Sequence, residues 1–234
     1  MISFRHPTTI LISGPTQCGK TFLFKQILAH ELIQPPPTRI IYVNNEKPPE
    51  LADYPNIEFV KGIKDLLAMY DGVEKRERTL IVLDDQMGEA GGSATISDLF
   101  TKGAHHQNIT VVYIVQNLFD KGRFHRTISL NSHYMVIFKN PRDQGQIRSL
   151  AQQAFPSKVK FLVQAFEDAT DRPYGYLLLD LHPQTPEEMR VRTKIFRNEE
   201  MEVYIPVQKG NNIDQKFLLS RDGYIKKMES AIIP

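Results

Sequence analysis

Residues 8–21 read TTILISGPTQCGKT, and they carry the strongest structural signal in the chain. A short apolar run rich in β-branched residues leads into an eight-residue match to the P-loop pattern G-x-x-x-x-G-K-[ST], namely Gly14-Pro15-Thr16-Gln17-Cys18-Gly19-Lys20-Thr21. The following residues, 22–32, place apolar side chains at helical spacing. A strand, a glycine-rich turn and a helix in this order are what phosphate binding requires. The sequence therefore predicts a phosphate-binding loop.

Each part of this loop has an expected role. The glycines let the backbone approach the phosphates, and backbone N–H groups at the helix N-terminus bind their negative charge. We expect Lys20 to reach the β- and γ-phosphates of ATP, and the Thr21 hydroxyl to bind Mg²⁺. No Cys/His catalytic pair is indicated for Cys18, so we expect its side chain to fill space. The alternative is a strand-to-helix turn that binds nothing.

Strand-like and helix-like runs alternate along the rest of the chain, which predicts an α/β fold with a mainly parallel sheet. We expect strands at 39–43, 57–60, 80–83, 110–115, 134–138, 174–181 and 191–196. We expect helices at 63–70, 96–102, 144–154 and 158–169. Residues 1–197 are predicted to form one ATPase domain, and the more polar residues 198–234 a C-terminal arm or tail.

Two adjacent acids follow a buried strand in the segment LIVLDD, residues 80–85. Ligands bind at the carboxyl edge of open α/β sheets, where such carboxylates would lie. Asp84 is the expected partner of Mg²⁺, and Asp85 would orient or deprotonate the attacking water. The alternative is an acid that caps a helix or a turn.

Gln116 ends the strand-like run VVYIVQN, residues 111–117. An amide both donates and accepts, so Gln116 is expected to sense the γ-phosphate and the water. A hydrogen bond to loop backbone is the alternative. Arginines follow this strand, and in ring ATPases an arginine from a neighbouring subunit stabilises phosphoryl transfer. Either Arg142, in the segment NPRD, or Arg126 could be this finger, and a solvated side chain is the alternative for each.

The composition excludes several classes of protein. The 234 residues are 41% hydrophobic and 24% charged, which excludes a collagen-like, low-complexity or wholly disordered chain. The chain shows no apolar run long enough for a membrane span and no secretory signal. One Cys cannot form an intrachain disulfide, which favours a reducing, intracellular location. The formal net charge of +2 excludes a uniformly basic surface but not several copies of a small basic patch in a ring.

With these residues identified, the chain resembles the FtsK/HerA superfamily of ring ATPases. It looks most like the poxvirus-type genome-packaging ATPases of Polinton/Maverick elements and related adintovirus-like DNA viruses. The matching segments are HPTTILISGPTQCGKT, LIVLDDQ, HHQNITVVYIVQNLF, SLNSHYMVIFKNPRDQGQIRSLAQQAFP and YGYLLLDLHPQTPEEMRVRTKIF. The P-loop is common to many ATPases, whereas the VQNLF and FKNPRD segments are more specific.

The resemblance implies a RecA-like P-loop NTPase core that assembles into a homo-oligomeric, pentameric or hexameric ring. Such rings couple ATP hydrolysis to the movement of double-stranded DNA into a preformed capsid. The implied partners are DNA and a capsid vertex or portal protein, at the nucleus or a viral assembly site of a host cell. On this resemblance Lys20, Thr21, Asp84, Asp85 and Gln116 occupy the nucleotide, metal, water-activating and sensor positions. The trans arginine is assigned to Arg142 first and Arg126 second.

Two other functions stay open from the residues alone. The first is a P-loop kinase of small molecules, which the size allows, although no arginine-rich lid is evident. The second is a nucleotide-dependent scaffold that docks on a capsid and hydrolyses little ATP. Asp85 is the reason that the scaffold hypothesis stays open, because its side chain is shorter than that of the Glu expected as the catalytic base at this position. Stimulation of hydrolysis by DNA distinguishes these functions.

Overall fold

The computed structural model of the chain describes residues 3–52, 54, 56–70, 77–84, 100, 108–119, 125–143, 145–206, 215–219 and 225–227. The chain groups into two compact units, Met1–Met135 and Val136–Pro234. The first unit contains the P-loop. None of the described helices is both long and apolar enough to cross a membrane.

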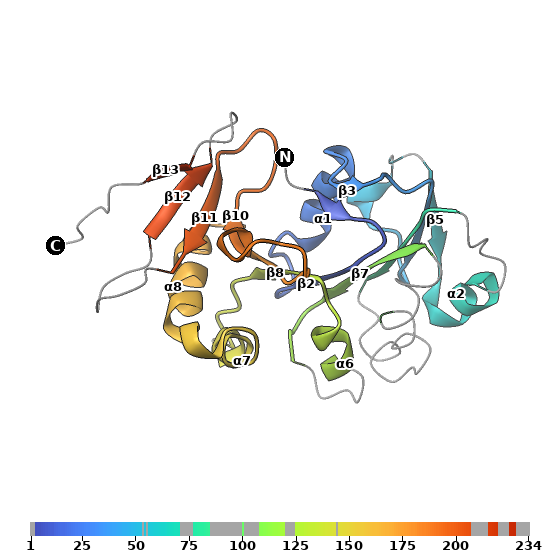
Figure 1. The fold of residues 1–234 in the computed structure, drawn as a ribbon. Helices are drawn as coiled ribbons and strands as arrows, with labels where there is room; N and C mark the ends of the chain where they lie inside the picture. The colour runs from blue at the N-terminus through green and yellow to red at the C-terminus, as the bar shows by residue number, and fades with distance from the viewer. Residues whose placement is uncertain are drawn as a thin grey trace. The chain divides into compact units, whose positions relative to one another are not determined.

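A parallel sheet with the strand order β2-β7-β6-β4-β5 forms the centre of the first unit (Figure 1). Its strands are β2 (Thr9–Ser13), β4 (Arg39–Val43), β5 (Ile57–Val60), β6 (Thr79–Asp84) and β7 (Ile109–Val115). Every residue of β2, β6 and β7 is buried, as expected for parallel strands covered on both faces. The predicted α/β fold with a mainly parallel sheet is confirmed.

The register of this sheet brings several strand ends to one edge. Ser13 at the end of β2 pairs with Val115 at the end of β7. Asp84 at the end of β6 pairs with Ile114. Strand β4 ends one position earlier, because Val43 pairs with the residue before Asp84. Side chains at or just beyond these ends therefore meet at the carboxyl edge, where open α/β sheets bind ligands.

The helices of the first unit are α1 (Lys20–Ala29), α2 (Gly62–Tyr70) and α6 (His125–Leu130), with a short 3₁₀ turn η1 (Pro49–Leu51). Helices α1 and α6 lie on opposite sides of the strands in Figure 1. Helix α1 begins two residues earlier than predicted, directly at the P-loop lysine. It ends at Ala29 rather than at Leu32, and Glu31 just beyond it has a left-handed backbone with φ of 50°.

Two short strands of the first unit were not predicted from the sequence. Strand β1 (Phe4–Arg5) pairs in parallel with β3 (Ile33–Gln34) and forms a separate two-stranded sheet. Each strand is only two residues long, so no alternating pattern can form. The predicted helix at 96–102 lies outside the described residues, apart from Phe100, whose buried ring packs edge-on against Tyr113.

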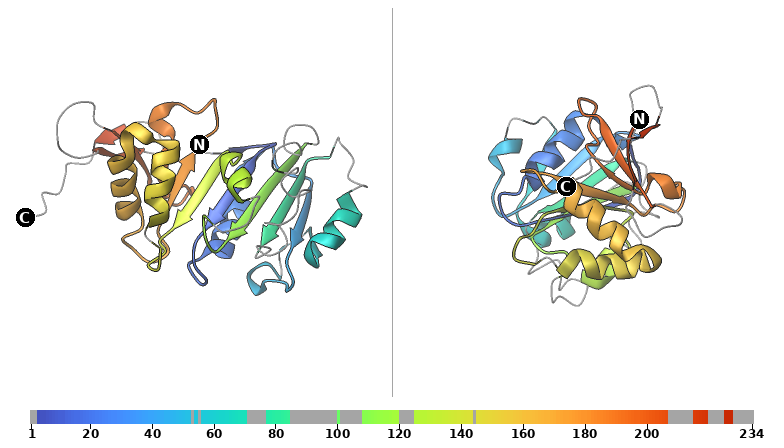
Figure 2. Two further views of the ribbon diagram at one scale, coloured as in Figure 1. Left: turned by 90° about the horizontal axis from the view of Figure 1, so that it is seen from below. Right: turned by 90° about the vertical axis from the view of Figure 1, so that its left-hand side faces the viewer.

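The second unit combines two helices with an antiparallel sheet. Its elements are α7 (Gly145–Ala154), η3 (Pro156–Lys158), α8 (Val159–Ala169), β9 (Tyr176–Asp180), η4 (Glu187–Met189), β10 (Val191–Thr193), β11 (Met201–Ile205), β12 (Gln215–Leu219) and β13 (Ile225–Lys227). Strand β8 (Tyr134–Phe138) spans the boundary between the units. Figure 2 shows α7 and α8 side by side, and α8 packs against β9 and β10. The helices predicted at 144–154 and 158–169 are confirmed to within a residue.

The predicted boundary between residues 197 and 198 falls between two paired strands of this sheet. Strand β11 pairs antiparallel with β10, and β12 pairs antiparallel with β11. The buried carboxylate of Glu202 in β11 accepts a hydrogen bond from Lys194 Nζ at 2.5 Å. Because Glu202 is charged but buried, β11 lacks the alternation of apolar and polar residues that predicts a strand. The sequence of this segment therefore predicts a polar tail.

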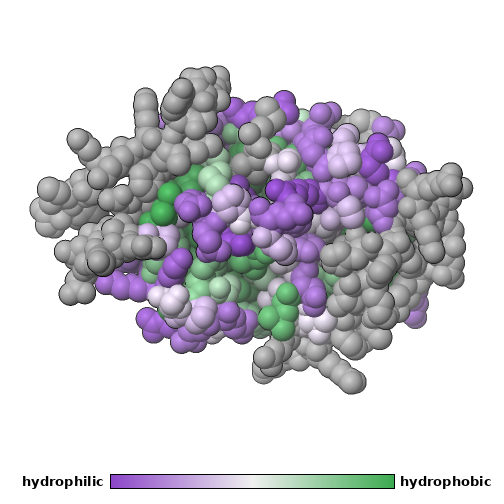
Figure 3. All heavy atoms as spheres, viewed as in Figure 1, coloured by the Kyte–Doolittle hydropathy of each residue, from purple (hydrophilic) through white to green (hydrophobic). Residues whose placement is uncertain are grey.

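The described surface is mostly polar on the face shown in Figure 3, with apolar side chains visible between the polar groups. Three large apolar side chains are nevertheless exposed on the described residues: Phe22, Leu130 and Tyr174.

Candidate functional site

The P-loop adopts a conformation that gathers backbone N–H groups. The amide of Cys18 donates to the carbonyl of Pro15 at 3.3 Å, which closes a tight turn. Gln17 and Gly19 have positive φ angles of 65° and 101°. Left-handed residues within such a turn direct successive N–H groups toward one side and form an anion-binding concavity. The α1 N-terminus adds its dipole to the same place, so the loop is built to hold negative charge.

Lys20 places its ammonium group against this loop. Its Nζ donates to the carbonyl oxygens of Gly14 at 2.6 Å and Pro15 at 2.9 Å. These two hydrogen bonds hold the positive charge beside the loop from which the N–H groups arise. The arrangement places one side-chain cation and several backbone dipoles where a phosphate group could bind.

Asp84 lies almost fully buried at the end of β6, in contact with two side chains from β4 and its extension. The hydroxyl of Tyr42 donates to Asp84 Oδ2 at 2.5 Å, and Asn44 Nδ2 donates to the same oxygen at 3.4 Å. The side chain of Thr21 lies close to the same phenol. Thr21 and Asp84, the two predicted metal ligands, are therefore brought together around one hydroxyl.

Burial and the neighbouring Asp84 carboxylate raise the pKa of Tyr42 far above its ordinary value, and Thr21 only partly opposes this rise. The phenol is therefore neutral and acts as a hydrogen-bond donor to Asp84. Sequence reasoning missed both Tyr42 and Asn44. The segment RIIYVNN, residues 39–45, does carry a signal, because two polar residues follow a buried strand of the same parallel sheet.

The chemistry of this donor set fits Mg²⁺. The hydroxyl of Thr21 and the carboxylate of Asp84 are hard oxygen donors, which Mg²⁺ prefers. Among the described residues no group of three or more His, Cys, Asp or Glu side chains could hold a metal ion. Mg²⁺ in nucleotide sites typically uses one or two protein oxygens together with phosphates and waters, so such a group is not required.

Gln116 is exposed directly after β7, and β7 lies between the strands that carry the P-loop and Asp84. It therefore joins the same edge. Asp85, the predicted general base, lies outside the described residues. Arg142 is exposed in a turn of the second unit, where its amide bonds the Asn140 side chain. Only the backbone of Arg126, in α6, is described. The assignment of the arginine finger stays a prediction.

Cys18 lies within the P-loop, between Gln17 and Gly19. Its side chain is half-buried, and burial raises the pKa of the thiol, although the nearby Lys20 opposes the shift. A raised pKa reduces the thiolate fraction at neutral pH, so the geometry favours a space-filling role over a nucleophilic one.

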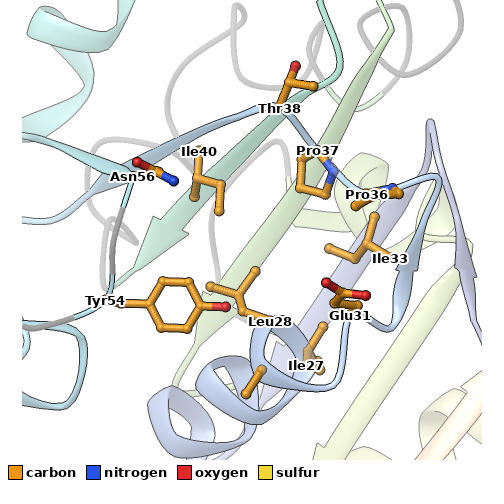
Figure 4. Close-up of a pocket in the computed structure, with 11 residues that line it drawn as sticks. Ile27, Leu28, Glu31, Ile33, Pro36, Pro37, Thr38, Ile40, Tyr54 and Asn56 are labelled. Carbon is orange, nitrogen blue, oxygen red and sulfur yellow. The ribbon is translucent and has the colours of Figure 1, made fainter.

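A pocket of about 320 Å³ lies elsewhere in the first unit, against the C-terminal half of α1 (Figure 4). Ile27 and Leu28 of α1 form one wall, and Tyr54 and Asn56 approach from another segment. No predicted site residue lines this pocket, so it is separate from the phosphate-binding edge.

A protein family described as AAA domain matches residues 6–160, which is well over half of the chain. No curated protein matches the chain. Solved structures do. The genome packaging NTPase B204 from Sulfolobus turreted icosahedral virus 2, in complex with ATP-gammaS, is 13% identical with a TM-score of 0.53. The match covers 80% of this chain and 95% of that chain.

A second match is B204, the DNA-packaging ATPase from Sulfolobus Turreted Icosahedral Virus. It is 10% identical with a TM-score of 0.51, and the match covers 86% of this chain and 98% of that one. At such identities the likeness establishes a shared fold. It agrees with the resemblance to packaging ATPases of the FtsK/HerA superfamily drawn from the sequence, and the fold is that of a P-loop NTPase. Together with the family match over residues 6–160, these findings show that the chain belongs to the AAA domain family.

Proposed function

We propose that this chain is the ATP-hydrolysing motor that moves double-stranded DNA into the preformed capsid of a virus or virus-like element. The observation that carries the proposal is the meeting of the P-loop, Asp84 and Gln116 at one edge of a parallel sheet. The B204 proteins of the same fold are described as a genome packaging NTPase and a DNA-packaging ATPase. The proposal extends that description to this chain.

The phosphate-binding part of the mechanism rests on the P-loop. The backbone N–H groups and Lys20 hold the β- and γ-phosphates of ATP and balance charge that develops during transfer. The ammonium of Lys20 exchanges its bonds to the Gly14 and Pro15 carbonyls for phosphate oxygens. Thr21 and Asp84 hold Mg²⁺, which supplies charge neutralisation to the phosphates when bound.

The hydrolytic part needs groups that orient water. Asp85 is proposed to accept a proton from the attacking water, and Gln116 to hydrogen-bond that water or the γ-phosphate. An arginine from the neighbouring subunit, Arg142 or otherwise Arg126, completes the site. A site that borrows a residue from its neighbour is active only in the assembled ring, which couples hydrolysis to assembly.

DNA binding follows from repetition of a small basic surface. The net charge of the chain is only +2, but a ring places several copies of one patch around a single duplex. The candidate contacts to the DNA phosphates are Lys102, Lys121 and Arg123. Such contacts do not depend on the base sequence of the DNA. A capsid vertex or portal protein is the second partner, at the nucleus or a viral assembly site inside a host cell.

Steady-state ATP hydrolysis with and without double-stranded DNA tests this function. We expect a several-fold stimulation by DNA in the wild-type protein. Lys20→Ala should abolish hydrolysis in both conditions, because the phosphates lose their mobile cation. Lys25→Ala is the matched control, since it removes one charge from the same helix without touching the loop, and it should behave like the wild type.

The alternatives predict different results. Turnover that ignores DNA but transfers phosphate to a small acceptor would establish a kinase. Nucleotide binding without turnover, alone or with DNA, would establish a docking scaffold. Equal turnover by Asp85→Asn and the wild type would remove Asp85 from the role of general base while leaving the motor itself standing.

A further inference from the structure

A single buried hydroxyl joins the two side chains that are proposed to hold the metal. Tyr42 of β4 is fully buried, and its hydroxyl donates to Asp84 Oδ2 at 2.5 Å. The Thr21 side chain lies close to the same phenol. Thr21 is the second residue of α1, Tyr42 lies in β4 and Asp84 ends β6, so three separate elements approach one another at this phenol.

The ring of Tyr42 is fixed by its surroundings. Phe24 of α1 has its ring centroid 5.8 Å away, and Phe59 of β5 has its centroid 5.7 Å away. In the sheet, Tyr42 pairs with Val82, two residues before Asp84. Because ladder pairing and aromatic packing both hold the ring, the hydroxyl has a defined position before any ligand arrives.

A hydroxyl in a fixed position constrains the groups that bind it. A carboxylate bonded at one oxygen to a rigid donor loses rotation about its terminal torsion, and Asn44 Nδ2 at 3.4 Å adds to this constraint. Partners beyond the direct ligands orient a metal site, and their loss typically weakens metal binding. The apolar ring alone would fill the core equally well, so the hydroxyl calls for a separate reason.

We propose that Tyr42 is a positioning residue that sets the Asp84 carboxylate and the Thr21 hydroxyl in register for Mg²⁺ bound with a nucleotide. This inference rests on the proposed function, because that function assigns Thr21 and Asp84 to the metal. Tyr42 touches neither the metal nor the nucleotide and acts through the other two residues. It thereby links the P-loop helix to the strand that carries the acid.

Tyr42→Phe tests the inference, because it keeps the ring and its aromatic contacts and removes only the hydroxyl. The probe is a fluorescent ATP analogue, titrated in EDTA and then at increasing Mg²⁺ with no DNA present. We expect the Mg²⁺ concentration that gives half of the Mg²⁺-dependent binding signal to rise about tenfold. Affinity in EDTA should stay within about twofold of the wild type, because the P-loop itself is unchanged.

Tyr134→Phe is the matched control. Tyr134 is equally buried in the same unit, and its hydroxyl accepts a hydrogen bond from the Arg5 amide at 3.3 Å. The Tyr134→Phe variant also loses a buried hydroxyl, but the Mg²⁺ concentration that gives half of the binding signal should stay unchanged. Thermal unfolding of both variants verifies that the fold is retained. In an Asp84→Asn background, which already weakens Mg²⁺ binding, Tyr42→Phe should add little, since it acts through that carboxylate.

The outcomes separate this inference from the proposed function. Equal Mg²⁺ titrations for Tyr42→Phe and a Mg²⁺-responsive wild type overturn the positioning role alone. A loss of affinity that is as large in EDTA as in Mg²⁺ also overturns it, because that pattern indicates a purely structural role. A wild-type protein whose nucleotide binding ignores Mg²⁺ overturns the assignment of Thr21 and Asp84, and both proposals fall together.

Discussion

The amide of Gly14 donates to the carbonyl of Val115 at 3.1 Å, so the first residue of the P-loop is joined to the last residue of β7. Gln116 follows Val115 directly and is exposed at the same edge. The backbone that carries the amide side chain is therefore fixed to the loop that receives the phosphates. In the proposed sensor role of Gln116, this link would hold its backbone at a fixed distance from the phosphate-binding loop.

Gln116→Ala is expected to lower kcat for ATP hydrolysis about a hundredfold and to leave KM nearly unchanged. The P-loop supplies the ground-state binding, whereas Gln116 is proposed to act on the water and the γ-phosphate. Steady-state kinetics measure both parameters. Gln116→Glu has nearly the same shape but lacks the N–H donor, and it should be about equally impaired. Normal turnover by Gln116→Glu would show that the donor is not what the reaction uses.

Gly19→Ala should damage both stability and nucleotide binding. Gly19 has φ of 101°, a region that residues with a Cβ rarely adopt. We expect the free energy of unfolding to fall by about 1–2 kcal/mol. Nucleotide affinity should fall with it, since the loop must distort. Denaturant titration and binding of a fluorescent ATP analogue measure the two effects.

Gly145→Ala provides the comparison for Gly19. A Cβ at Gly145, the first residue of α7, would lie 3.6 Å from Asp143 Oδ1, an ordinary contact. Alanine favours a helix, so this substitution should be neutral or stabilising by about 0.5 kcal/mol. Equal effects at the two glycines would mean that the conformation of the P-loop does not limit stability or binding.

Arg142→Ala tests the shared site of the proposed ring. Arg142 is exposed in a turn, so its loss should leave folding intact while hydrolysis falls about a thousandfold. Mixing Arg142→Ala with Lys20→Ala subunits should restore part of the activity, because some interfaces then combine an intact Lys20 with an intact Arg142. The readout is ATP turnover against mixing ratio.

Arg148→Ala, also exposed on α7, is the control and should keep its activity. If Arg126→Ala shows the complementation and Arg142→Ala does not, the arginine finger is Arg126 rather than Arg142. If mixing restores nothing for either arginine, the trans arrangement is wrong.

The sequence predicted the features that depend on local pattern. Apolar runs identified the strands of the parallel sheet, and the P-loop match predicted a helix directly after the loop, although that helix begins two residues earlier, at Lys20. The chain order of Asp84 and Gln116, each at the end of a buried strand, was enough to expect them at one edge. Parallel strands share their carboxyl edge, so this inference needs no knowledge of strand order.

The features that the sequence did not reveal depend on long-range contacts. Tyr42 reads as one apolar residue of a core strand, and its partner Asp84 lies 42 positions away. Nothing in the local pattern distinguishes a tyrosine that fills a core from one whose hydroxyl binds a carboxylate. The same holds for Glu202, because its buried carboxylate accepts a hydrogen bond from Lys194, which lies outside β11.

Asp180→Ala should destabilise the second unit strongly. Asp180 and Arg192 are both about 95% buried, and Arg192 donates to Asp180 Oδ2 at 2.5 Å. Thr185 donates to the other carboxylate oxygen at 2.8 Å. Removing the carboxylate leaves a buried guanidinium without its counter-charge, which typically costs about 3–5 kcal/mol. Urea titration followed by circular dichroism measures the loss.

Glu187→Ala is the surface counterpart of that change. Its ion pair with Arg190 is nearly as short, at 2.6 Å, but the Glu187 side chain is 64% exposed. Exposed pairs contribute little, so the free energy of unfolding should change by less than about 1 kcal/mol. A similar cost for both substitutions would mean that burial does not set the strength of the Asp180–Arg192 pair.

His6 gives the first unit a pH dependence whose sign follows from its surroundings. Burial lowers the pKa of His6 from its ordinary value of 6.5, Arg78 adds to the shift, and hydrogen bonding to Asn108 opposes it. Its ring nitrogens lie 2.7 Å from Thr110 Oγ1 and 3.0 Å from Asn108 Oδ1. As the pH falls, His6 therefore takes up its proton at a higher pH in the unfolded chain than in the folded chain. The contribution of His6 to the free energy of unfolding is therefore fully present above pH 6.5, and it is lost as the pH falls through the lower pKa of the folded state.

His6→Gln should flatten that dependence. Glutamine does not titrate, so the fall in the free energy of unfolding between pH 7 and pH 5 should be smaller than in the wild type. Denaturant titrations at several pH values measure the slope. The slope is the quantity to compare, because losing a hydrogen bond to Thr110 or Asn108 lowers stability at every pH alike. An unchanged slope would show that His6 protonates at the same pH in the folded and unfolded chains, and that its burial carries no electrostatic cost.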